Sequence, residues 1–327
     1  MTEKTYRAFV TEGEKQGRVV ERHIEELPED GVLVKVHYSS VNYKDAMTLD
    51  KDANIAEHYP IVPGIDSAGV IEDAGDSSFE AGQNVIVTSY ALGTGRDGGF
   101  AEYIRVPEEW IVPLPEKLSL KDAMILGTAG FTAALSIDRL EHSGITPEDK
   151  PVLVTGASGG VGSIAVDMLS GRGYSVTAST GRMEEKAFLE KLGADEVVSR
   201  EEVTPEKVKP LQSQRWAAAV DPTGGTPLAS ILASLKHNGA CAVSGLTAGV
   251  EVPTTVIPFI LRGVTLLGVD SVYCPMEQRK HVWERAADDL KPSHMEDIAQ
   301  EITLDGLQET LEAIRESRVR GRVIVRL

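Results

Sequence analysis

The stretch VLVTGASGGVGSIAV at residues 152–166 contains a glycine-rich loop between two apolar runs. Its glycines are Gly156, Gly159, Gly160 and Gly162. Glycines remove side chains where backbone approaches a pyrophosphate, and a following helix adds unpaired N–H donors at its N-terminus. The stretch therefore predicts a dinucleotide-binding loop. The alternative is a tight strand-to-helix turn that holds no ligand.

Strand and helix patterns alternate on both sides of this loop. The preceding segment SLKDAMILGTAGFTAALSIDRL is apolar at helical spacing, and Ser119 and Asp122 are placed as a capping box. Helices are predicted over 161–170 and over 183–192, the second ending at Gly193. The predicted strands are VLVTG, SVTAST, DEVVS, AAAVDPTG, ACAVSGL and VTLLGVD. Continuous apolar strands separated by amphipathic helices predict an α/β fold with a parallel sheet covered on both faces.

The two ends of the chain carry a different pattern. The first 120 residues are punctuated by Gly and Pro, and GVLVKVHYSSV (31–41), SAGVIEDAG and QNVIVTSY indicate short strands. Near the C-terminus, Leu307, Leu311 and Ile314 share one helix face, and the final RVIVRL alternates in hydrophobicity. This alternation resembles the first region, so the tail is predicted to return to a β-rich N-terminal domain.

The end of the second strand of the α/β region indicates the nucleotide. NAD-binding units place Asp or Glu there to bind the ribose hydroxyls. Here the chain continues with Ser179, Thr180, Gly181 and Arg182, and Arg200 follows the third strand. Hydroxyls and an arginine can bind a 2′-phosphate, which favours NADP over NAD. The alternative for Arg182 is a solvated charge at a helix start.

Composition limits the remaining classes. The chain has 327 residues and a formal net charge of −17, which disfavours nucleic acid and anionic membranes as partners. Cys241 and Cys274 are too few for a disulfide framework or a thiolate zinc site. The start MTEKTYRAFV lacks the features of a signal peptide, and we expect no apolar stretch long enough to span a bilayer. A cytoplasmic protein of two domains is predicted.

The loop also fits the T-G-x-x-x-G-x-G pattern of short-chain dehydrogenases. Those enzymes place the pattern at the N-terminus and follow it with a catalytic Y-x-x-x-K. In this chain it begins at Thr155, and none of the eight tyrosines has a lysine four residues later. The short-chain alternative is therefore excluded.

Several motifs in order resemble the medium-chain dehydrogenase/reductase superfamily: YPIVPGIDSAGVIEDAG, FEAGQNVIV, GGFAEYIRVPEEWIVPLPE and then the glycine loop. The resemblance covers essentially the whole chain. It implies a GroES-like catalytic domain at 1–122 and 294–327, a Rossmann domain at 123–293, and an active site in the cleft between them. It also implies a homodimer formed through the edge of the Rossmann sheet, for which VTLLGVD is a plausible edge.

The zinc ligands of that superfamily are not seen in this sequence. Zinc-dependent members have a cysteine after the early strand and a G-H-E motif after the Pro-Gly turn. This chain has SVNYKD at 40–45 and Gly64-Ile65-Asp66 instead, with no cysteine before Cys241, and its seven histidines show no ligand spacing. No metal is therefore predicted.

Within the superfamily, VNYKD, PGIDSAG, LRGVTLLGVDSV and TGASGGVG resemble the zinc-free quinone oxidoreductase-like branch that includes acryloyl-CoA reductases. The resemblance implies transfer of hydride from NADPH to a C=C bond conjugated to a carbonyl, in an enoyl thioester or an enone. The alternatives are an NADPH:quinone oxidoreductase, and a non-catalytic NADPH-binding sensor or structural protein.

Such a reduction without a metal needs a donor for the charge that develops on the carbonyl oxygen, and a proton source. Tyr43 is the predicted catalytic donor, because the resemblance places it beside the nicotinamide. Asn42 and Asp45 complete the predicted catalytic group: Asn42, or Lys44, positions or tunes the phenol, and Asp45 anchors the turn. The alternatives are a Tyr43 that packs on the cofactor while water supplies the proton, and an Asn42 that only makes an Asx turn.

The remaining cofactor contacts follow from the resemblance. The pyrophosphate is assigned to Ser158, Gly159, Gly160 and Val161, and the adenosine phosphate to Thr180, Gly181, Arg182 and Arg200. The nicotinamide half is assigned to Leu246, Ile260 and Ser271, with Tyr43. Thr128 either contacts the nicotinamide or caps a helix turn, and core packing is the alternative for Leu246 and Ile260.

A small-molecule substrate is expected, and a CoA thioester would need basic residues for its phosphates. The candidates are Arg96, Arg105, Arg262, Arg279 and Lys280. The sequence does not place them around one opening, so it does not identify the substrate.

Overall fold

The computed structural model describes residues 4–327, which form two compact units. Unit 1 comprises the N-terminal region up to Thr128 with Val272–Lys280 and Glu296–Leu327, and unit 2 comprises Ala129–Ser271 with His281–Met295. The first division falls at residue 128, whereas the sequence placed it at 122. The segment 272–280, expected in the Rossmann domain, packs with unit 1.

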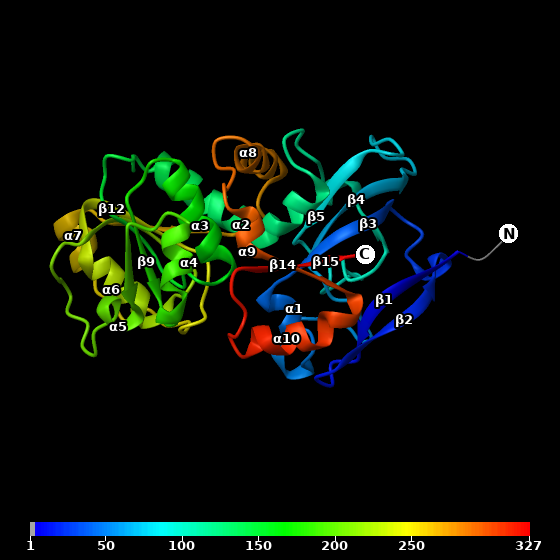
Figure 1. Cartoon of the computed structure of the whole chain (residues 1–327), viewed down its shortest axis with the longest axis horizontal. Helices are drawn as coiled ribbons and strands as arrows, with labels where there is room; N and C mark the ends of the chain where they lie inside the picture. Colours follow the sequence, from blue (N-terminus) through cyan, green and yellow to red (C-terminus); the bar gives the residue numbers. More distant parts are fainter. Residues whose placement is uncertain (1–3) are drawn as a thin grey trace. The chain divides into compact units, whose positions relative to one another are not determined.

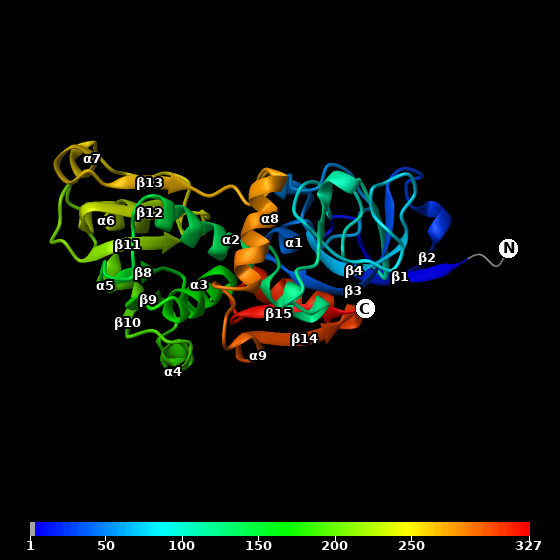
Figure 2. The same cartoon turned by 90° about the horizontal axis from the view of Figure 1, so that it is seen from above.

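Unit 2 is built on a six-stranded parallel sheet. Its strands lie one below another in Figure 2, from β13 at the top to β10 at the bottom. The order is β10 (Glu196–Ser199), β9 (Val176–Thr180), β8 (Val152–Val154), β11 (Trp216–Asp221), β12 (Leu235–Val243) and β13 (Thr265–Gly268). In chain order this is 3-2-1-4-5-6, the arrangement of a Rossmann fold, with the strand order reversing between β8 and β11. The predicted parallel α/β sheet is confirmed.

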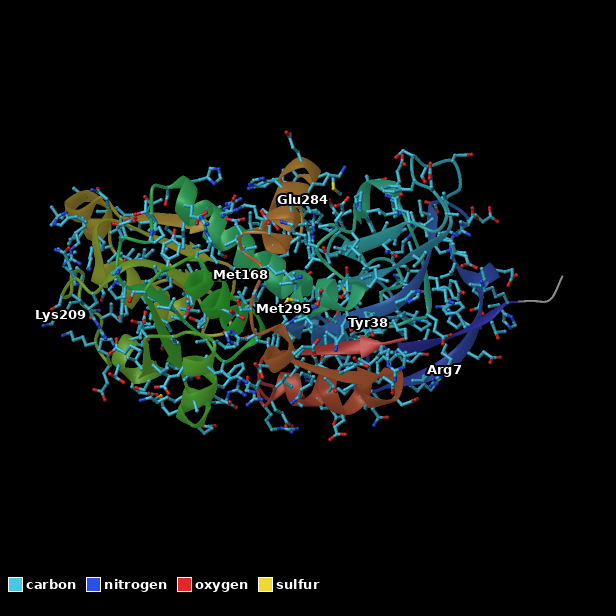
Figure 3. The ribbon with its side chains drawn as sticks, turned by 45° about the horizontal axis from the view of Figure 1, so that its top comes forward. Arg7, Tyr38, Met168, Lys209, Glu284 and Met295 are labelled. Carbon is cyan, nitrogen blue, oxygen red and sulfur yellow. The ribbon has the colours of Figure 1, made fainter. Side chains whose placement is uncertain are left out.

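Helices cover this sheet because its strands are apolar on both faces. They are α3 (Gly160–Gly171), α4 (Lys186–Lys191), α5 (Arg200–Val203), α6 (Gly225–Ser234) and α7 (Ile257–Arg262). Residues 162–169 of α3 are buried, among them Met168, which Figure 3 labels. A one-turn 3₁₀ helix, Met183–Glu185, precedes α4, and the predicted stop at Gly193 coincides with a φ of 98° there.

The helix α2 (Leu120–His142) begins with the predicted capping box. The Ser119 N–H donates to the Asp122 carboxylate at 3.1 Å, and the Asp122 N–H donates to the Ser119 hydroxyl at 3.0 Å. By length and composition α2 could cross a membrane, contrary to the sequence expectation. It is nevertheless a core helix, since most of its apolar stretch is buried and Gly127 breaks it with non-helical angles (φ 52°, ψ −157°).

Unit 1 contains a mostly antiparallel sheet (Figure 1). Its order is β14 (Ala299–Thr303), β15 (Arg322–Arg326), β3 (Val32–Val41), β4 (Asp66–Asp73), β5 (Asn84–Thr88) and β7 (Ile111–Pro113), with β6 (Tyr103–Val106) also on β3. The strands β1 (Thr5–Thr11) and β2 (Gly17–His23) pair separately. The helices are α1 (Tyr43–Met47) and α10 (Leu307–Arg315); α8 (Met276–Ala287) and α9 (Met295–Ile298) lie at the unit boundaries.

The C-terminal strand returns to unit 1 as predicted, since β15 pairs antiparallel with β3. The predicted alternation of RVIVRL is wrong, because Arg322 through Val325 are all buried. The side chain of Arg322 is only 3% exposed and lies among polar groups inside the unit. Arg322 is therefore a buried charged residue that is bound by polar groups of unit 1.

Candidate active site

The glycine loop lies at the carboxyl end of β8, beside the start of α3. Gly156 has a φ of 53°, and a methyl group on Gly162 would overlap the backbone of Gly156 and Ala157. The loop backbone is thus folded back on itself in a conformation that needs glycine at both positions. Ser158 is buried, whereas Gly159, Gly160 and Val161 are partly exposed at the helix N-terminus, where N–H groups can bind an anion.

The end of β9 contacts this loop through polar groups. The Arg182 guanidinium donates to the Ser158 hydroxyl at 3.0 Å and to the Ser158 carbonyl at 3.2 Å. The hydroxyls of Ser158 and Thr180 lie 3.0 Å apart, and the Arg182 N–H donates to the Thr180 hydroxyl. The structure therefore brings together the residues assigned to the pyrophosphate and to the adenosine phosphate.

Arg200 lies at the same edge. A methyl group on Gly181 would overlap the Arg200 guanidinium, which shows that the two are in close contact. Arg200 is exposed at the start of α5, after β10. Two guanidinium groups thus flank the end of β9, and the segment Thr180–Arg182 supplies no carboxylate. This donor set fits a phosphorylated ribose.

Asp221 is a residue of this edge that the sequence analysis missed. It is fully buried at the end of β11 and accepts hydrogen bonds from the hydroxyls of Thr155 and Thr223 at 2.5 Å, and from the N–H groups of Thr223 and Gly224 at 3.0 Å. It joins the loops after β8 and β11, where the strand order reverses. A carboxylate ending the apolar run AAAVD was the signal that could have identified it.

The three residues assigned to the nicotinamide half have different positions. Leu246 follows β12, is 63% exposed, and lies beside Gly224 of the neighbouring loop. Ser271 follows β13, so both lie at the carboxyl edge. Ile260 does not: it is on α7, whose Arg262 donates to the carbonyls of Ala233 and Leu235 where β12 begins. Figure 2 shows α7 at the opposite end of β13 from its arrowhead. The predicted position of Ile260 at this edge is wrong, because α7 lies where β12 begins. The core-packing alternative for Leu246 and Ile260 is wrong as well, because both side chains are exposed. Contact of either residue with the nicotinamide stays a prediction.

In unit 1, Tyr43 is the first residue of α1 and its side chain is half exposed. A helix of five residues is too short to be stable alone, so its position depends on its cap. The Asn42 N–H donates to the Asp45 carboxylate at 2.7 Å, and the other carboxylate oxygen accepts the Ile65 N–H at 2.9 Å. Asp45 thus binds the turn that carries Tyr43 to its own first residue, Asn42, and to Ile65.

Asp45 is fully buried and both of its oxygens bind backbone N–H groups, so it anchors the turn and presents no atom to a substrate. Burial, followed by the charge of Asp66, raises the pKa of Asp45 to about 7. The Asn42 amide is also engaged: its nitrogen donates to Asp66 at 2.7 Å and its oxygen accepts from Arg322 at 3.1 Å. These contacts fit the predicted roles, in which Asp45 anchors the turn and Asn42 positions Tyr43.

Asp66 is the centre of this network. One oxygen accepts from the Ser40 hydroxyl at 2.6 Å, the Asn42 amide at 2.7 Å and the Thr128 N–H at 2.9 Å; the other accepts from the Thr128 hydroxyl at 2.5 Å. The break at Gly127 leaves the Thr128 N–H without a helical acceptor, and Asp66 supplies one. The Ser89 hydroxyl lies 3.1 Å from that of Thr128. Thr128 therefore caps the second part of α2.

No group of three or more His, Cys, Asp or Glu side chains that could hold a metal ion occurs among residues 4–327. At the position of the G-H-E motif, Ile65 is a buried apolar residue and Asp66 is occupied by the four donors described above. Neither side chain offers a ligand there.

The arginines proposed for CoA phosphates have other partners. Arg96 pairs with Asp30, Arg105 with the Gly31 carbonyl, and Arg262 with backbone carbonyls of unit 2. Arg279 is fully buried, where it donates to Thr88 and Val272 and lies 4.6 Å from the centroid of the Tyr90 ring. Lys280 alone of the five is exposed. Each of these arginines thus has partners in its own unit that stabilise the fold.

Two family models and several known proteins match this chain. The chain matches the model of the alcohol dehydrogenase GroES-like domain at residues 28–116 and that of the zinc-binding dehydrogenase at residues 160–289. It is 55% identical over 304 residues to the Bacillus subtilis protein named quinone oxidoreductase YhfP, covering 93% of this chain and 92% of that protein. The chain belongs to the medium-chain dehydrogenase/reductase superfamily. It lies in the quinone oxidoreductase-like branch that includes acrylyl-CoA reductases, as the sequence motifs predicted.

Two further members of this superfamily are informative. The acrylyl-CoA reductase AcuI of Ruegeria pomeroyi is 43% identical over 313 residues, covering 96% of this chain and 95% of that protein. The crystal structure of B. subtilis YhfP with NAD bound has a TM-score of 0.97, 52% identity, and 99% and 100% coverage of the two chains. The Salmonella enterica YhdH oxidoreductase in complex with NADP has a TM-score of 0.94, 42% identity and the same coverage.

Proposed function

We propose that the chain is an NADPH-dependent reductase of C=C bonds conjugated to a carbonyl, with acrylyl-CoA as the leading substrate. The observation that carries this proposal is the 43% identity to the R. pomeroyi acrylyl-CoA reductase across nearly the full length of both chains. The geometry supports it, because the carboxyl edge of unit 2 has the donor set of a dinucleotide site and Tyr43 presents an exposed phenol in unit 1.

NADPH would supply the hydride. The residues that would hold it are those of the unit 2 edge: the loop Ser158–Val161 for the pyrophosphate, and Arg182 with Arg200 for the 2′-phosphate. A related structure contains NAD and another contains NADP, so the choice depends on the residues of this chain. Two guanidinium groups at the end of β9, with no carboxylate in Thr180–Arg182, favour NADPH.

The role of Tyr43 is to donate a hydrogen bond to the carbonyl oxygen of the substrate. Negative charge develops on that oxygen when the β-carbon is reduced, and a positioned O–H donor stabilises it. The same phenol can then give its proton to the α-carbon, with solvent restoring it. Asn42 and Asp45 hold the turn that carries Tyr43 and take no part in proton transfer.

The test is oxidation of NADPH by the purified protein, followed by absorbance, with acrylyl-CoA and a simple quinone in parallel. We expect saturable turnover with the thioester. Tyr43→Phe should lower kcat about 10²-fold, the usual contribution of general acid catalysis, at unchanged NADPH affinity. Tyr38→Phe, on β3, is the matched control and should retain wild-type kcat. Full activity of Tyr43→Phe would assign the proton to water.

A second candidate is quinone reduction, favoured by the 55% identity to YhfP. Turnover of the quinone without turnover of the thioester would establish it. Tight NADPH binding with neither activity would instead favour a sensor or structural role.

The NADPH assignment is tested by Arg182→Ala. Loss of a charge-assisted hydrogen bond to a phosphate should weaken NADPH binding by about 10- to 100-fold. NADH, which lacks the 2′-phosphate, should bind with unchanged affinity. Equal weakening of both nucleotides would contradict the assignment.

The assembly is proposed to be a homodimer of cytoplasmic location. The support is an edge strand, β13, whose Leu266 is 38% exposed, and the helix that precedes it, α7, whose Ile260 and Leu261 are 72% and 59% exposed. An open strand edge with exposed apolar side chains is suited to pairing with a second copy. Light scattering should give twice the chain mass, and Leu266→Glu should halve it; a monomeric wild type would reject the dimer.

A further inference from the structure

Arg322 carries a buried positive charge, and each of its three side-chain nitrogens donates to an acceptor in unit 1. Its Nε donates to the Ile125 carbonyl and its Nη1 to the Val41 carbonyl, both at 3.1 Å. Nη1 also donates to the Asn42 side-chain oxygen at 3.1 Å, and Nη2 donates to the Ser40 hydroxyl at 2.8 Å and lies 3.7 Å from Asp66. A fork of five N–H groups is a property of arginine that lysine does not share.

These acceptors come from distant parts of unit 1. Ser40 and Val41 end β3, Asn42 caps α1, Ile125 lies in α2, and Arg322 itself begins β15. Asp66, at the start of β4, completes the set by accepting from Ser40, Asn42 and Thr128. A single guanidinium–carboxylate pair thus fixes the start of α1 and the break in α2 in one frame.

The frame constrains two proposed site residues. The Asn42 amide is bound by Arg322 at its oxygen and by Asp66 at its nitrogen, so the residue before Tyr43 has one orientation. Thr128 is bound to Asp66 through both its N–H and its hydroxyl. A methyl group on Gly127 would overlap Ser40, Asp66 and Arg322, which shows how closely the broken helix approaches the pair.

We propose that Arg322 and Asp66 are positioning residues for the reaction, which hold Tyr43 and Thr128 at a fixed separation without contacting substrate or cofactor. The expected loss of kcat rests on the proposed function. The expected loss of a fixed position for Tyr43 does not. Burial makes such a pair costly to hold, and a fold-stabilising role alone would be filled equally well by apolar side chains. Placement of Tyr43 accounts for a buried ionic pair whose polar partners lie around the turn that carries it.

The first test is Arg322→Lys, which retains the charge and loses the fork. Misplacement of a donor by about 1 Å can lower the rate by about 10²-fold, so kcat should fall by about 10- to 100-fold, with NADPH affinity within about threefold of wild type. The matched control is Arg262→Lys in unit 2, which also loses a set of carbonyl contacts. It should lower the melting temperature without lowering kcat. Equal kcat losses in the two variants would overturn the proposal.

A double-mutant cycle separates positioning from general destabilisation. If Arg322 acts through Tyr43, then Arg322→Lys should change kcat by less than about threefold in the Tyr43→Phe background. If the double variant instead loses kcat by the product of the two single losses, Arg322 does not act through Tyr43. Should Arg322→Lys fail to fold, Ser40→Ala is the substitute, because it removes one hydroxyl that joins Arg322 to Asp66.

The fixed position of Tyr43 can be tested by a measurement that does not depend on enzymatic activity. Incorporation of 3-fluorotyrosine gives fluorine resonances for the eight tyrosines, and Tyr43→Phe identifies the resonance of Tyr43. We expect this resonance to be narrow in wild type and in Arg262→Lys, and broadened or split in Arg322→Lys. An unchanged Tyr43 resonance in Arg322→Lys would overturn the proposal. Absence of wild-type turnover would reject the proposed function alone.

Discussion

The two units each contain a buried carboxylate that gathers four donors, but the charges are compensated differently. Asp66 of unit 1 lies 3.7 Å from the Arg322 guanidinium. Asp221 of unit 2 binds two threonine hydroxyls and two N–H groups that lead into α6, so hydroxyls and a helix N-terminus balance its charge. One site depends on a cation 256 residues away in the sequence, and the other on two neighbouring loops.

This difference shows how the dinucleotide edge of unit 2 and the Tyr43 turn of unit 1 are each held in place. The dinucleotide edge consists of turns at the ends of successive strands, and each turn is specified by residues near it. The Tyr43 turn depends on strands and helices that meet only when unit 1 is complete. Substitutions should therefore have local effects in unit 2 and long-range effects in unit 1.

The largest effect is expected for Asp66→Asn, which keeps the donors of Ser40 and Thr128 near an oxygen but removes the carboxylate that lies 3.7 Å from the buried Arg322 guanidinium. Breaking one partner of a buried ion pair costs about 3–5 kcal/mol in the free energy of unfolding. Urea unfolding followed by circular dichroism measures it. The double variant Asp66→Asn/Arg322→Met should recover part of the loss; if it is less stable than the single variant, the ionic explanation is wrong.

A smaller loss is expected for Asp221→Asn, because no buried cation is left behind. Loss of hydrogen bonds from Thr223 or Gly224 costs about 1–3 kcal/mol. This variant should also weaken binding of both NADPH and NADH, since Thr155 immediately precedes the glycine loop. Titration of nucleotide fluorescence measures this effect. A loss of stability as large as that of Asp66→Asn would remove the contrast between the two carboxylates.

Asp45 provides a pH-dependent comparison. Its pKa is raised from 3.8 to about 7, so the native state retains a proton that the unfolded chain releases. Its contribution to stability is full below about pH 3.8, falls as the pH rises, and is lost above about pH 7. The difference in unfolding free energy between wild type and Asp45→Asn should therefore shrink from about pH 4 to about pH 7. Parallel pH curves for the two proteins would contradict this.

The smallest effect is expected for Gly181→Ala. The added methyl group would displace the Arg200 guanidinium, the far end of a flexible side chain, and leave the backbone in place. NADPH binding should weaken by about 3- to 10-fold, below 1.4 kcal/mol, and NADH binding should not change. Gly171→Ala is the matched control, since a methyl group there meets no atom within 4 Å. Equal weakening in both glycine variants would exclude a role for Arg200.

Much of unit 2 could be predicted because its signals are local. The strand VLVTG and the glycine loop each depend on residues a few positions apart, and the structure contains both. The Ser119–Asp122 capping box, at the start of α2 in unit 1, was predicted from an equally local signal. Ile260 was misplaced because sequence order shows that it lies between two strands, but not at which end of the crossover.

The frame around Tyr43 could not be predicted in the same way. Asp66 was noticed only as a replacement for a metal ligand, and Arg322 only as the first residue of a strand with alternating hydrophobicity. Neither residue has a local reason for its position, since each is explained by partners brought together by β3, α2 and β15. A charged residue within an apolar run is the one signal that sequence offers for such groups.

The late position of β15 in the chain has a consequence for synthesis. Residues 38–41 of β3 pair with β15, which is translated some 280 residues later. At about 5–20 residues per second, this edge of β3 waits at least about 14 seconds for its partner strand. Unit 2 and its nucleotide-binding edge can form in that interval, whereas the Tyr43 turn must wait for Arg322. A nascent chain can therefore acquire nucleotide affinity before it acquires the means to reduce anything.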